Sequence, residues 1–152
     1  APLAPSARVD RVLLPVDGSD GALAAVRQVI ALAQAHPQPA AFSVDLVNVQ
    51  PALSRDVSSF VAGKTLQEYH GERSAEDLTG ARHLLDAAGL TYRVHTRVGQ
   101  AAAEICDLAR ELAVDQIVIG TRGQGAAAAA IMGSVASETV EKAPVPVLVV
   151  KN

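Results

Sequence analysis

Short runs rich in valine, leucine and isoleucine alternate along this chain with segments whose apolar residues recur at helical spacing. The predicted strands are Arg11–Val16, Phe42–Val49, Tyr92–Val98, Asp115–Ile119 and Val145–Val150. The predicted helices run from Asp20 to before Pro37, from about Glu72 to Ala88, over Gln100–Leu112, and from Ser134 to about Lys142. Such regular alternation is typical of an α/β fold, in which helices cover both faces of an open parallel sheet.

The length of the chain limits it to one domain of this kind. Its 152 residues suffice for a single core, and although 29 alanines inflate the 49% apolar fraction, 20 valines, 15 leucines and 5 isoleucines remain to fill that core. The first residues contain two prolines and form no strand or helix pattern. We therefore expect residues 1–8 to be a flexible leader and residues 9–152 to form one domain.

Charge and composition exclude several classes of function. Lys and Arg total 13 against 16 Asp and Glu, and four aromatic residues offer little surface for base stacking, so nucleic acid is a poor candidate partner. No apolar stretch approaches the roughly 18 residues of a membrane-spanning helix, and the lone Cys106 cannot form an internal disulfide. These features favour a cytoplasmic protein.

The remaining ligand-type residues indicate no metal centre. The four histidines are not arranged at a spacing typical of metal ligands, so we expect them to lie on the surface and expect no metal site. Cys106 stands beside Ile105 and Ala109 in a predicted helix, which favours a buried, inert thiol.

Two predicted strands end in unusual loops. Asp17-Gly18-Ser19 follows the first strand, and Gly120-Thr-Arg-Gly123 follows the fourth, with nine residues before Gly133-Ser134 begins a helix. Glycine lets the backbone approach a phosphate closely, and the free N–H groups at a helix start attract anions. Ligands of open α/β sheets bind at the carboxyl ends of strands, so these loops predict a phosphate-binding site.

These residues together resemble the universal stress protein family, in particular its ATP-binding subgroup. The resemblance rests on Gly120-x2-Gly123-x9-Gly133-Ser134, on the opening Arg11-Val-Leu-Leu-Pro-Val-Asp17-Gly-Ser, and on the closing Ala143-Pro-Val-Pro-Val-Leu-Val-Val150. It covers Arg11 to Lys151. It implies a Rossmann-like, adenine nucleotide alpha hydrolase-like sheet of strand order 3-2-1-4-5, an adenine nucleotide between the first and fourth strands, and a homodimer formed through the last strand, Val145–Val150.

The resemblance also implies roles for individual residues. Asp17 would accept hydrogen bonds from the ribose hydroxyls, and Val49 would lie against adenine and offer its backbone to the base edge. The base and ribose pocket would be lined by Pro15 and Ile119. The phosphates would be bound by Gly120, Gly123, Gly133, Ser134 and the backbone amide of Val135.

Two positions depart from the family pattern. The family often has a basic side chain in the nine-residue spacer, whereas residues 124–132 contain none, so Arg122 is the nearest candidate cation for the phosphates. ATP with Mg²⁺ is therefore the expected ligand, with ADP and AMP as alternatives. The family's second strand commonly has histidine before its closing valine, where this chain has Asn48.

Simpler structural roles stay open for the same residues. Ser134 is a possible N-cap, a role compatible with phosphate binding, and Asp17 is a possible cap of the first helix together with Ser19. Arg122 is a possible solvated surface residue. Residues 50–71 are either helical or a lid over the base.

The leading interpretation is a homodimeric nucleotide-dependent switch in the stress response, in which ATP changes the loop from Thr121 to Met132 and thereby partner binding. No Gly-x4-Gly-Lys-Ser/Thr motif and no obvious base for an attacking water are present, so we expect no enzyme activity beyond very slow ATP hydrolysis. The alternatives are a ligand-free dimeric interaction module of the same fold and, less favoured, an adenylyl-transferring enzyme.

Overall fold

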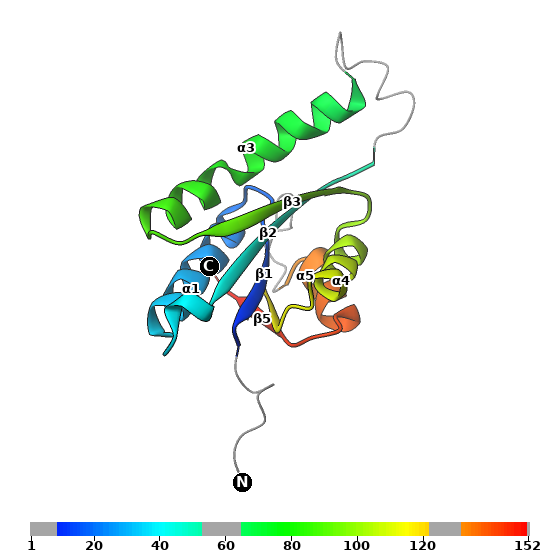
Figure 1. Cartoon of the computed structure of the whole chain (residues 1–152). Coiled ribbons are helices and arrows are strands. Elements are labelled where there is room, and N and C mark those ends of the chain that lie inside the picture. Colours follow the sequence, from blue (N-terminus) through cyan, green and yellow to red (C-terminus); the bar gives the residue numbers. More distant parts are fainter. Residues whose placement is uncertain (1–8, 53–64, 122–131, 152) are drawn as a thin grey trace.

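The computed structural model describes residues 9–52, 65–121 and 132–151. Its strands are β1 (Arg11–Pro15), β2 (Ser43–Gln50), β3 (Tyr92–Val98), β4 (Gln116–Gly120) and β5 (Val147–Val150). Its helices are α1 (Asp20–Ala35), the short 3-10 helix η2 (Pro39–Ala41), α3 (Leu66–Ala87), α4 (Ala101–Leu112) and α5 (Ser134–Lys142). Figure 1 shows strands and helices alternating along the chain, as the sequence predicts.

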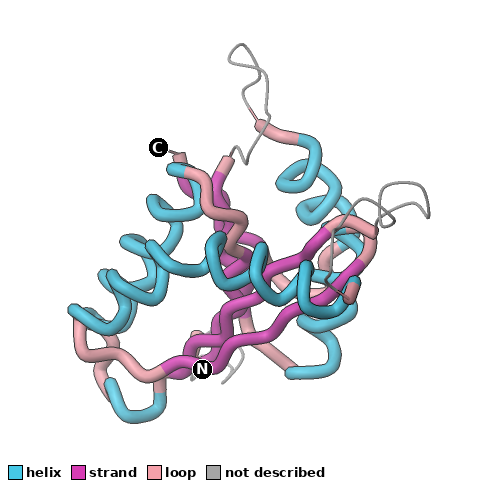
Figure 2. Tube along the Cα trace, turned by 90° about the horizontal axis from the view of Figure 1, so that it is seen from above, coloured by secondary structure: helices cyan, strands magenta, loops and turns pink. Residues whose placement is uncertain are grey.

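The five strands form one parallel sheet of order β3-β2-β1-β4-β5. This confirms the predicted fold class and strand order. Figure 2 shows the strands as a central layer between helices. Because β1 lies in the middle of the sheet, its side chains Val12, Leu13 and Leu14 are fully buried.

Two apolar clusters, one on each face, hold the helices on the sheet. On one face Val12, Leu14 and Leu46 pack with apolar residues of α1 and α3. On the other face Leu13 and Ile117 pack with apolar residues of α4 and α5. Alternate residues of the central strands therefore enter opposite clusters, as a sheet buried on both faces requires.

The structure changes two predicted boundaries by more than one residue. α3 begins at Leu66 rather than near Glu72, because the Thr65 hydroxyl accepts a hydrogen bond from the Glu68 backbone amide (3.1 Å) and caps the helix. The Thr-x-x-Glu spacing that marks this start is visible in the sequence. β5 begins at Val147 rather than Val145, after Pro146, whose carbonyl accepts a hydrogen bond from the Ile117 amide (3.0 Å).

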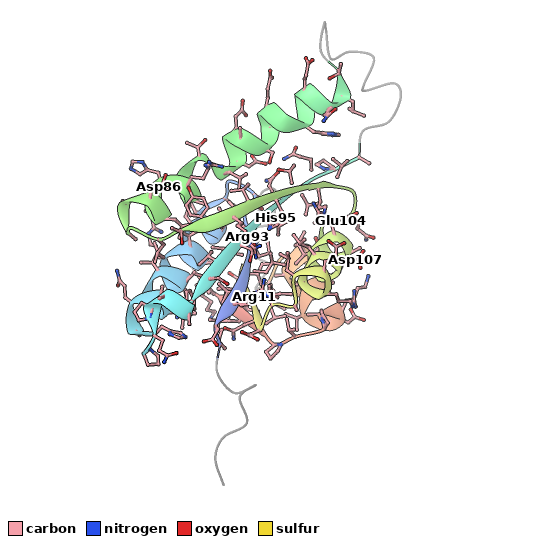
Figure 3. All side chains as sticks on the ribbon, in the orientation of Figure 1. Arg11, Asp86, Arg93, His95, Glu104 and Asp107 are labelled. Atoms are coloured by element: carbon pink, nitrogen blue, oxygen red, sulfur yellow. The ribbon has the colours of Figure 1, made fainter. Side chains whose placement is uncertain are left out.

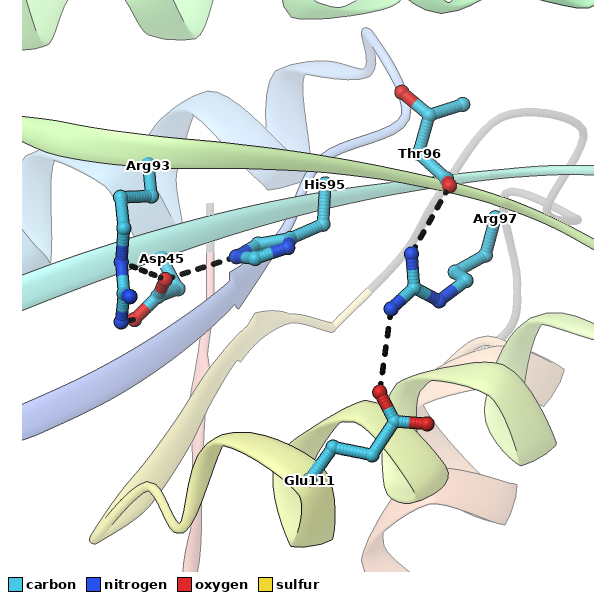
Figure 4. Close-up of polar contacts among 6 residues, drawn as sticks. All are labelled: Asp45, Arg93, His95, Thr96, Arg97 and Glu111. Atoms are coloured by element: carbon cyan, nitrogen blue, oxygen red, sulfur yellow. Dashed lines mark hydrogen bonds and ion pairs between the residues drawn. The ribbon is translucent and has the colours of Figure 1, made fainter.

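A fully buried carboxylate joins β2 to the edge strand β3. Asp45 lies directly opposite Arg93: its Oδ2 accepts a hydrogen bond from Arg93 Nη2 (3.2 Å), and its Oδ1 forms an ion pair with Arg93 Nε (2.9 Å). His95 Nε2 lies 2.9 Å from the same carboxylate (Figure 4). Figure 3 shows Arg93 and His95 next to each other on β3. The desolvated charge of Asp45 thus has partners from the edge strand only in this one register.

We expect Arg93→Ala to lower the free energy of unfolding by about 1.5–3 kcal/mol, because it removes charged hydrogen bonds from a buried carboxylate. Urea denaturation measures the change. Arg73→Ala is the matched control, since Arg73 lies 3.7 Å from Glu76 and both side chains are exposed. It should cost less than about 0.5 kcal/mol. Equal losses in the two variants would contradict this assignment.

A close backbone contact fixes the end of β4 against the start of α1. A Cβ atom added to Gly120 would lie 2.4 Å from the carbonyl oxygen of Gly21 and 3.1 Å from its Cα. Both groups are backbone, so neither moves without shifting its whole element. Glycine at position 120 therefore has a packing reason that requires no ligand.

We expect Gly120→Ala to destabilise the protein by about 1–3 kcal/mol through this overlap. Gly71 is the matched control, because a Cβ there meets nothing within 4 Å. Gly71 lies inside α3 and is exposed, so Gly71→Ala should stabilise by about 0.5–1 kcal/mol. A Gly120→Ala protein as stable in urea as the wild type would refute the contact.

Candidate functional site

The predicted site lies where the direction of strand addition reverses. The chain adds β2 and β3 on one side of β1 and β4 and β5 on the other, so β1 and β4 are neighbours and pair at Val12–Gln116 and Leu13–Ile117. The loops that follow these two strands leave the sheet side by side, at the carboxyl ends of the strands. We call this place the β1/β4 edge. Open α/β sheets bind ligands at this point.

The loop after β1 is organised around Asp17. Its Oδ1 accepts hydrogen bonds from the backbone amide (3.0 Å) and the hydroxyl of Ser19. Ser19 Oγ in turn accepts from the Ala22 amide (3.1 Å), so Ser19 is the N-cap of α1. Gly18, between them, has a φ of 84°, a conformation that favours glycine. Asp17 therefore supports the cap residue and is not itself the cap.

The helix after β4 begins without a side-chain cap. Gly133 occupies the N-cap position, and Ser134 is the first helical residue, with an exposed side chain. The alternative that Ser134 is the N-cap is therefore wrong. Its hydroxyl stands beside the first N–H groups of α5, which lack partners within the helix and carry partial positive charge. Such a terminus suits an anion.

Hydrogen bonds join the residue that follows β4 to the residue that precedes α5 and to the end of β5. The Thr121 amide donates to the Val150 carbonyl (2.9 Å), and the Gly133 amide donates to the Thr121 carbonyl (2.6 Å). The Gly133 N–H thus already has a hydrogen-bond acceptor within the protein. Amides of Ser134 and Val135 are the predicted donors that this contact leaves available for a phosphate.

The contact between Gly21 and Gly120 joins the two halves of the site. Gly21 lies in the first turn of α1, directly after the Asp17–Ser19 loop, and Gly120 precedes Thr121, which is bonded to Gly133. A continuous series of contacts therefore links the carboxylate of Asp17 with the start of α5.

The predicted pocket-lining residues gather near this edge. Ile119 is 6% exposed and belongs to the core cluster under α4 and α5, and Val49 and Met132 pack against the same cluster. Pro15 is half-buried at the end of β1, opposite Val47. The predicted residues Arg122 and Gly123 lie outside the described residues.

Sequence reasoning missed a group of buried polar residues beside the site. Asn48 and Gln50 of β2 are 0% and 5% exposed, and both bond to Asp77 of α3. The signal available in the sequence was two amide side chains two residues apart near the end of a strand, a spacing that places them on one face. Their partner on α3 gives no comparable signal.

The expectation that all four histidines lie on the surface was wrong. His70 is 6% exposed, and its Nε2 has no hydrogen-bond partner among the residues that the structure describes. The His36 side chain is 5% exposed and lies 2.8 Å from Asp10 Oδ1. The centroid of the His36 ring lies 5.5 Å from that of Phe42, and the centroid of the His70 ring lies 5.9 Å from that of Tyr69, contacts that periodicity alone did not reveal. Cys106 is buried as expected, and burial raises the pKa of its thiol.

The chain resembles known proteins in both sequence and structure. The model of the universal stress protein family matches residues 8–151. The chain belongs to the universal stress protein family. Universal stress protein Sll1654 of Synechocystis is 31% identical over 143 residues, which are 91% of this chain and 83% of that protein. Within the ranges that the structure describes, no helix is both long and apolar enough to cross a membrane.

Solved universal stress proteins have the same fold. UspA from Lactobacillus plantarum is 25% identical, with a TM-score of 0.78 over 94% of this chain and 98% of that one. The Archaeoglobus fulgidus protein, solved in complex with dAMP, is 24% identical, with a TM-score of 0.68 over 95% of this chain and 98% of that one. Two more distant universal stress proteins, 22% and 16% identical, were solved with cAMP and with AMP.

Proposed function

We propose that this universal stress protein binds an adenine nucleotide at the β1/β4 edge and acts as a nucleotide-dependent switch of the ATP-binding subgroup in the cytoplasm. The observation that carries the proposal is the Gly21–Gly120 contact, which joins the Asp17 loop to the uncapped start of α5. A carboxylate and a helix N-terminus are complementary to two polar parts of a nucleotide, its sugar hydroxyls and its phosphates.

The residues fit such a ligand from one end to the other. Asp17 would accept hydrogen bonds from ribose hydroxyls, because a carboxylate only accepts. Ser134 and Val135 would donate to phosphate through their amides, and Ser134 also through its exposed hydroxyl. Val49, Ile119 and Pro15 would border the base. Arg122, Gly120 and Gly123 keep their predicted roles at the phosphates.

Solved relatives support the choice of an adenine nucleotide. The proteins crystallised with dAMP, AMP and cAMP share the fold, so this fold accommodates an adenine nucleotide. We infer that this chain takes ATP with Mg²⁺, and ADP or AMP as alternatives. Bound Mg²⁺ would neutralise part of the phosphate charge where residues 124–132 contain no basic side chain.

The proposed output of binding is a change between Thr121 and Met132. The two ends of this segment are anchored beside the proposed phosphate site, by the hydrogen bond between Thr121 and Gly133 and by the packing of Met132 on the core. A nucleotide bound at α5 would therefore act on the segment directly. Its change in conformation would alter the binding of a partner protein.

We expect Ser134→Ala to weaken binding of ATP and AMP by about tenfold, because it removes one hydroxyl that donates to a charged phosphate. Calorimetric titration measures the affinities. Ser137→Ala is the matched control, since Ser137 is exposed one turn later on the same helix. It should bind both nucleotides as the wild type does. The absence of heat for ATP, ADP and AMP in the wild type would favour the ligand-free module.

We also propose that the protein is a switch rather than an enzyme, with ATP turnover no faster than about one per minute, far below the roughly 1–10³ s⁻¹ of ordinary enzymes. Hydrolysis needs a group that orients or activates water at the terminal phosphate. The sequence contains no Gly-x4-Gly-Lys-Ser/Thr motif and no obvious base for an attacking water. Phosphate release from ATP and Mg²⁺ measures the rate. A rate near 1 s⁻¹ would overturn this proposal.

The last strand supports the further proposal of a homodimer through Val145–Val150. β5 is an edge of the described sheet, and its four residues are all half-buried and apolar. Pro146 and Val150 turn their carbonyls toward β4 and the residue after it, accepting from Ile117 and Thr121. Val147 and Val149 therefore turn their backbone groups to the outer edge, where a second β5 can pair with them.

We expect Val149→Pro to convert the dimer into a monomer of 15.7 kDa, because it removes one outward N–H from β5. Sedimentation equilibrium measures the mass. Pro146→Ala is the control, since residue 146 faces β4, and it should remain dimeric. A wild-type protein that is monomeric at micromolar concentration would exclude this dimer.

A further inference from the structure

Three side chains form a closed hydrogen-bonded cluster between β2 and α3. Gln50 Nε2 donates to Asn48 Oδ1 (2.7 Å) and to Asp77 Oδ2 (3.0 Å). Asn48 Nδ2 donates to the same Asp77 oxygen (3.2 Å) and to the backbone carbonyl of Val16 (2.8 Å). We call these three residues the amide cluster. Burying it is costly unless its polar atoms are paired, and these bonds use all four amide N–H groups.

The amide cluster fixes the orientation of Asn48. Its Nδ2 faces two acceptors, the carbonyl of Val16 and the carboxylate of Asp77, while its Oδ1 faces a donor on Gln50. A flipped amide would bring oxygen against both acceptors and nitrogen against the donor. Asp77 and Gln50 therefore determine which atom Asn48 presents to β1.

The bond from Asn48 reaches the residue directly before Asp17. The Val16 amide donates to the Val47 carbonyl (2.9 Å), and the Val16 carbonyl accepts from Asn48. Both backbone polar groups of Val16 are thus held by β2. This fixes the peptide plane from which Asp17 departs, just beyond the last residue of β1. The direction of the Asp17 side chain depends on that plane.

We propose that Asn48 is a positioning residue for sugar recognition, which holds Val16 so that Asp17 is preset to accept from the vicinal hydroxyls of a ribose. The inference rests on the proposed nucleotide binding and names a selectivity within it. Asp77 and Gln50 act through Asn48 by orienting its amide. The protein therefore selects ribonucleotides over nucleotides that lack both hydroxyls.

A purely structural role for the amide cluster would be to attach α3 to the sheet. A second pair of side chains makes such an attachment without contacting the Asp17 loop. Ser74 is one turn before Asp77 on α3, and its Oγ lies 2.9 Å from Thr96 Oγ1 on β3. This pair also joins α3 to the sheet but touches neither Val16 nor β1. Thr96→Val therefore weakens the attachment of α3 without affecting Asp17, and serves as the matched control for Asn48→Leu.

Two measurements on the folded variants test the proposal. The first is hydrogen exchange of the Ser19 amide, which donates to Asp17, in the protein without nucleotide. Asn48→Leu should speed this exchange about fivefold, the equivalent of one ordinary hydrogen bond. The second is the affinity ratio of ATP to 2′,3′-dideoxy-ATP by calorimetry. The wild type should prefer ATP by about tenfold or more, since the hydroxyls bond to a carboxylate.

In Asn48→Leu we expect this preference to fall below about threefold, while the affinity for dideoxy-ATP stays within about threefold of wild type. Thr96→Val should keep the wild-type exchange and preference. Unchanged Ser19 exchange in Asn48→Leu, an unchanged preference, or equal changes in Thr96→Val would overturn the proposal. If Asn48→Leu does not fold, Asp77→Ala, which removes an acceptor that orients Asn48, takes its place with the same expectations.

The two measurements separate this inference from the proposed function. A wild-type protein that binds neither nucleotide contradicts nucleotide binding itself. Hydrogen exchange at Ser19 then still decides whether Asn48 holds the Asp17 loop. A wild type that binds ATP and dideoxy-ATP equally well contradicts sugar selection and leaves nucleotide binding intact.

Discussion

The close approach of Gly21 and Gly120 is the constraint on which the site depends. A side chain at position 120 would overlap the backbone of α1, so β4 and α1 reach this distance only with glycine there. The contact aligns the loop after β1 with the segment after β4. Without it, the Asp17 loop and the start of α5 would be related only through the pairing of β1 with β4, and neither is a nucleotide site alone.

Different interactions hold the central strands of the sheet and its edge strand β3. Apolar packing on both faces fixes β1 and β4, whose central residues are fully buried. The edge strand β3 is half exposed and depends more on the charged pairing of Arg93 and His95 with Asp45. β2, between β1 and β3, contributes Asn48 and Gln50 to the amide cluster at positions where apolar side chains could have packed against α3. We attribute these buried polar residues to the need to position Asp17 rather than to a gain in the free energy of unfolding.

The fold and the outline of the site could be predicted from local patterns. Periodicity identified the five strands and four α-helices but not the short η2, and the spacing of Gly120, Gly133 and Ser134 marked the turn into α5. The pairings between distant residues could not be predicted in this way. Gly21 meets Gly120, and Asp77 meets Asn48, only because the sheet order brings them together. The start of α3 was missed for another reason: its Thr65 cap precedes a largely polar helix.

The central claim is that an adenine nucleotide occupies the β1/β4 edge. Titration of ATP into isotopically labelled protein, followed by amide chemical shifts, tests it most directly. The account predicts the largest shifts at Ser19, Ser134 and Val135, with little change along the outer strand β3. Largest shifts along β3, or no shifts at any residue at millimolar ATP, would contradict it.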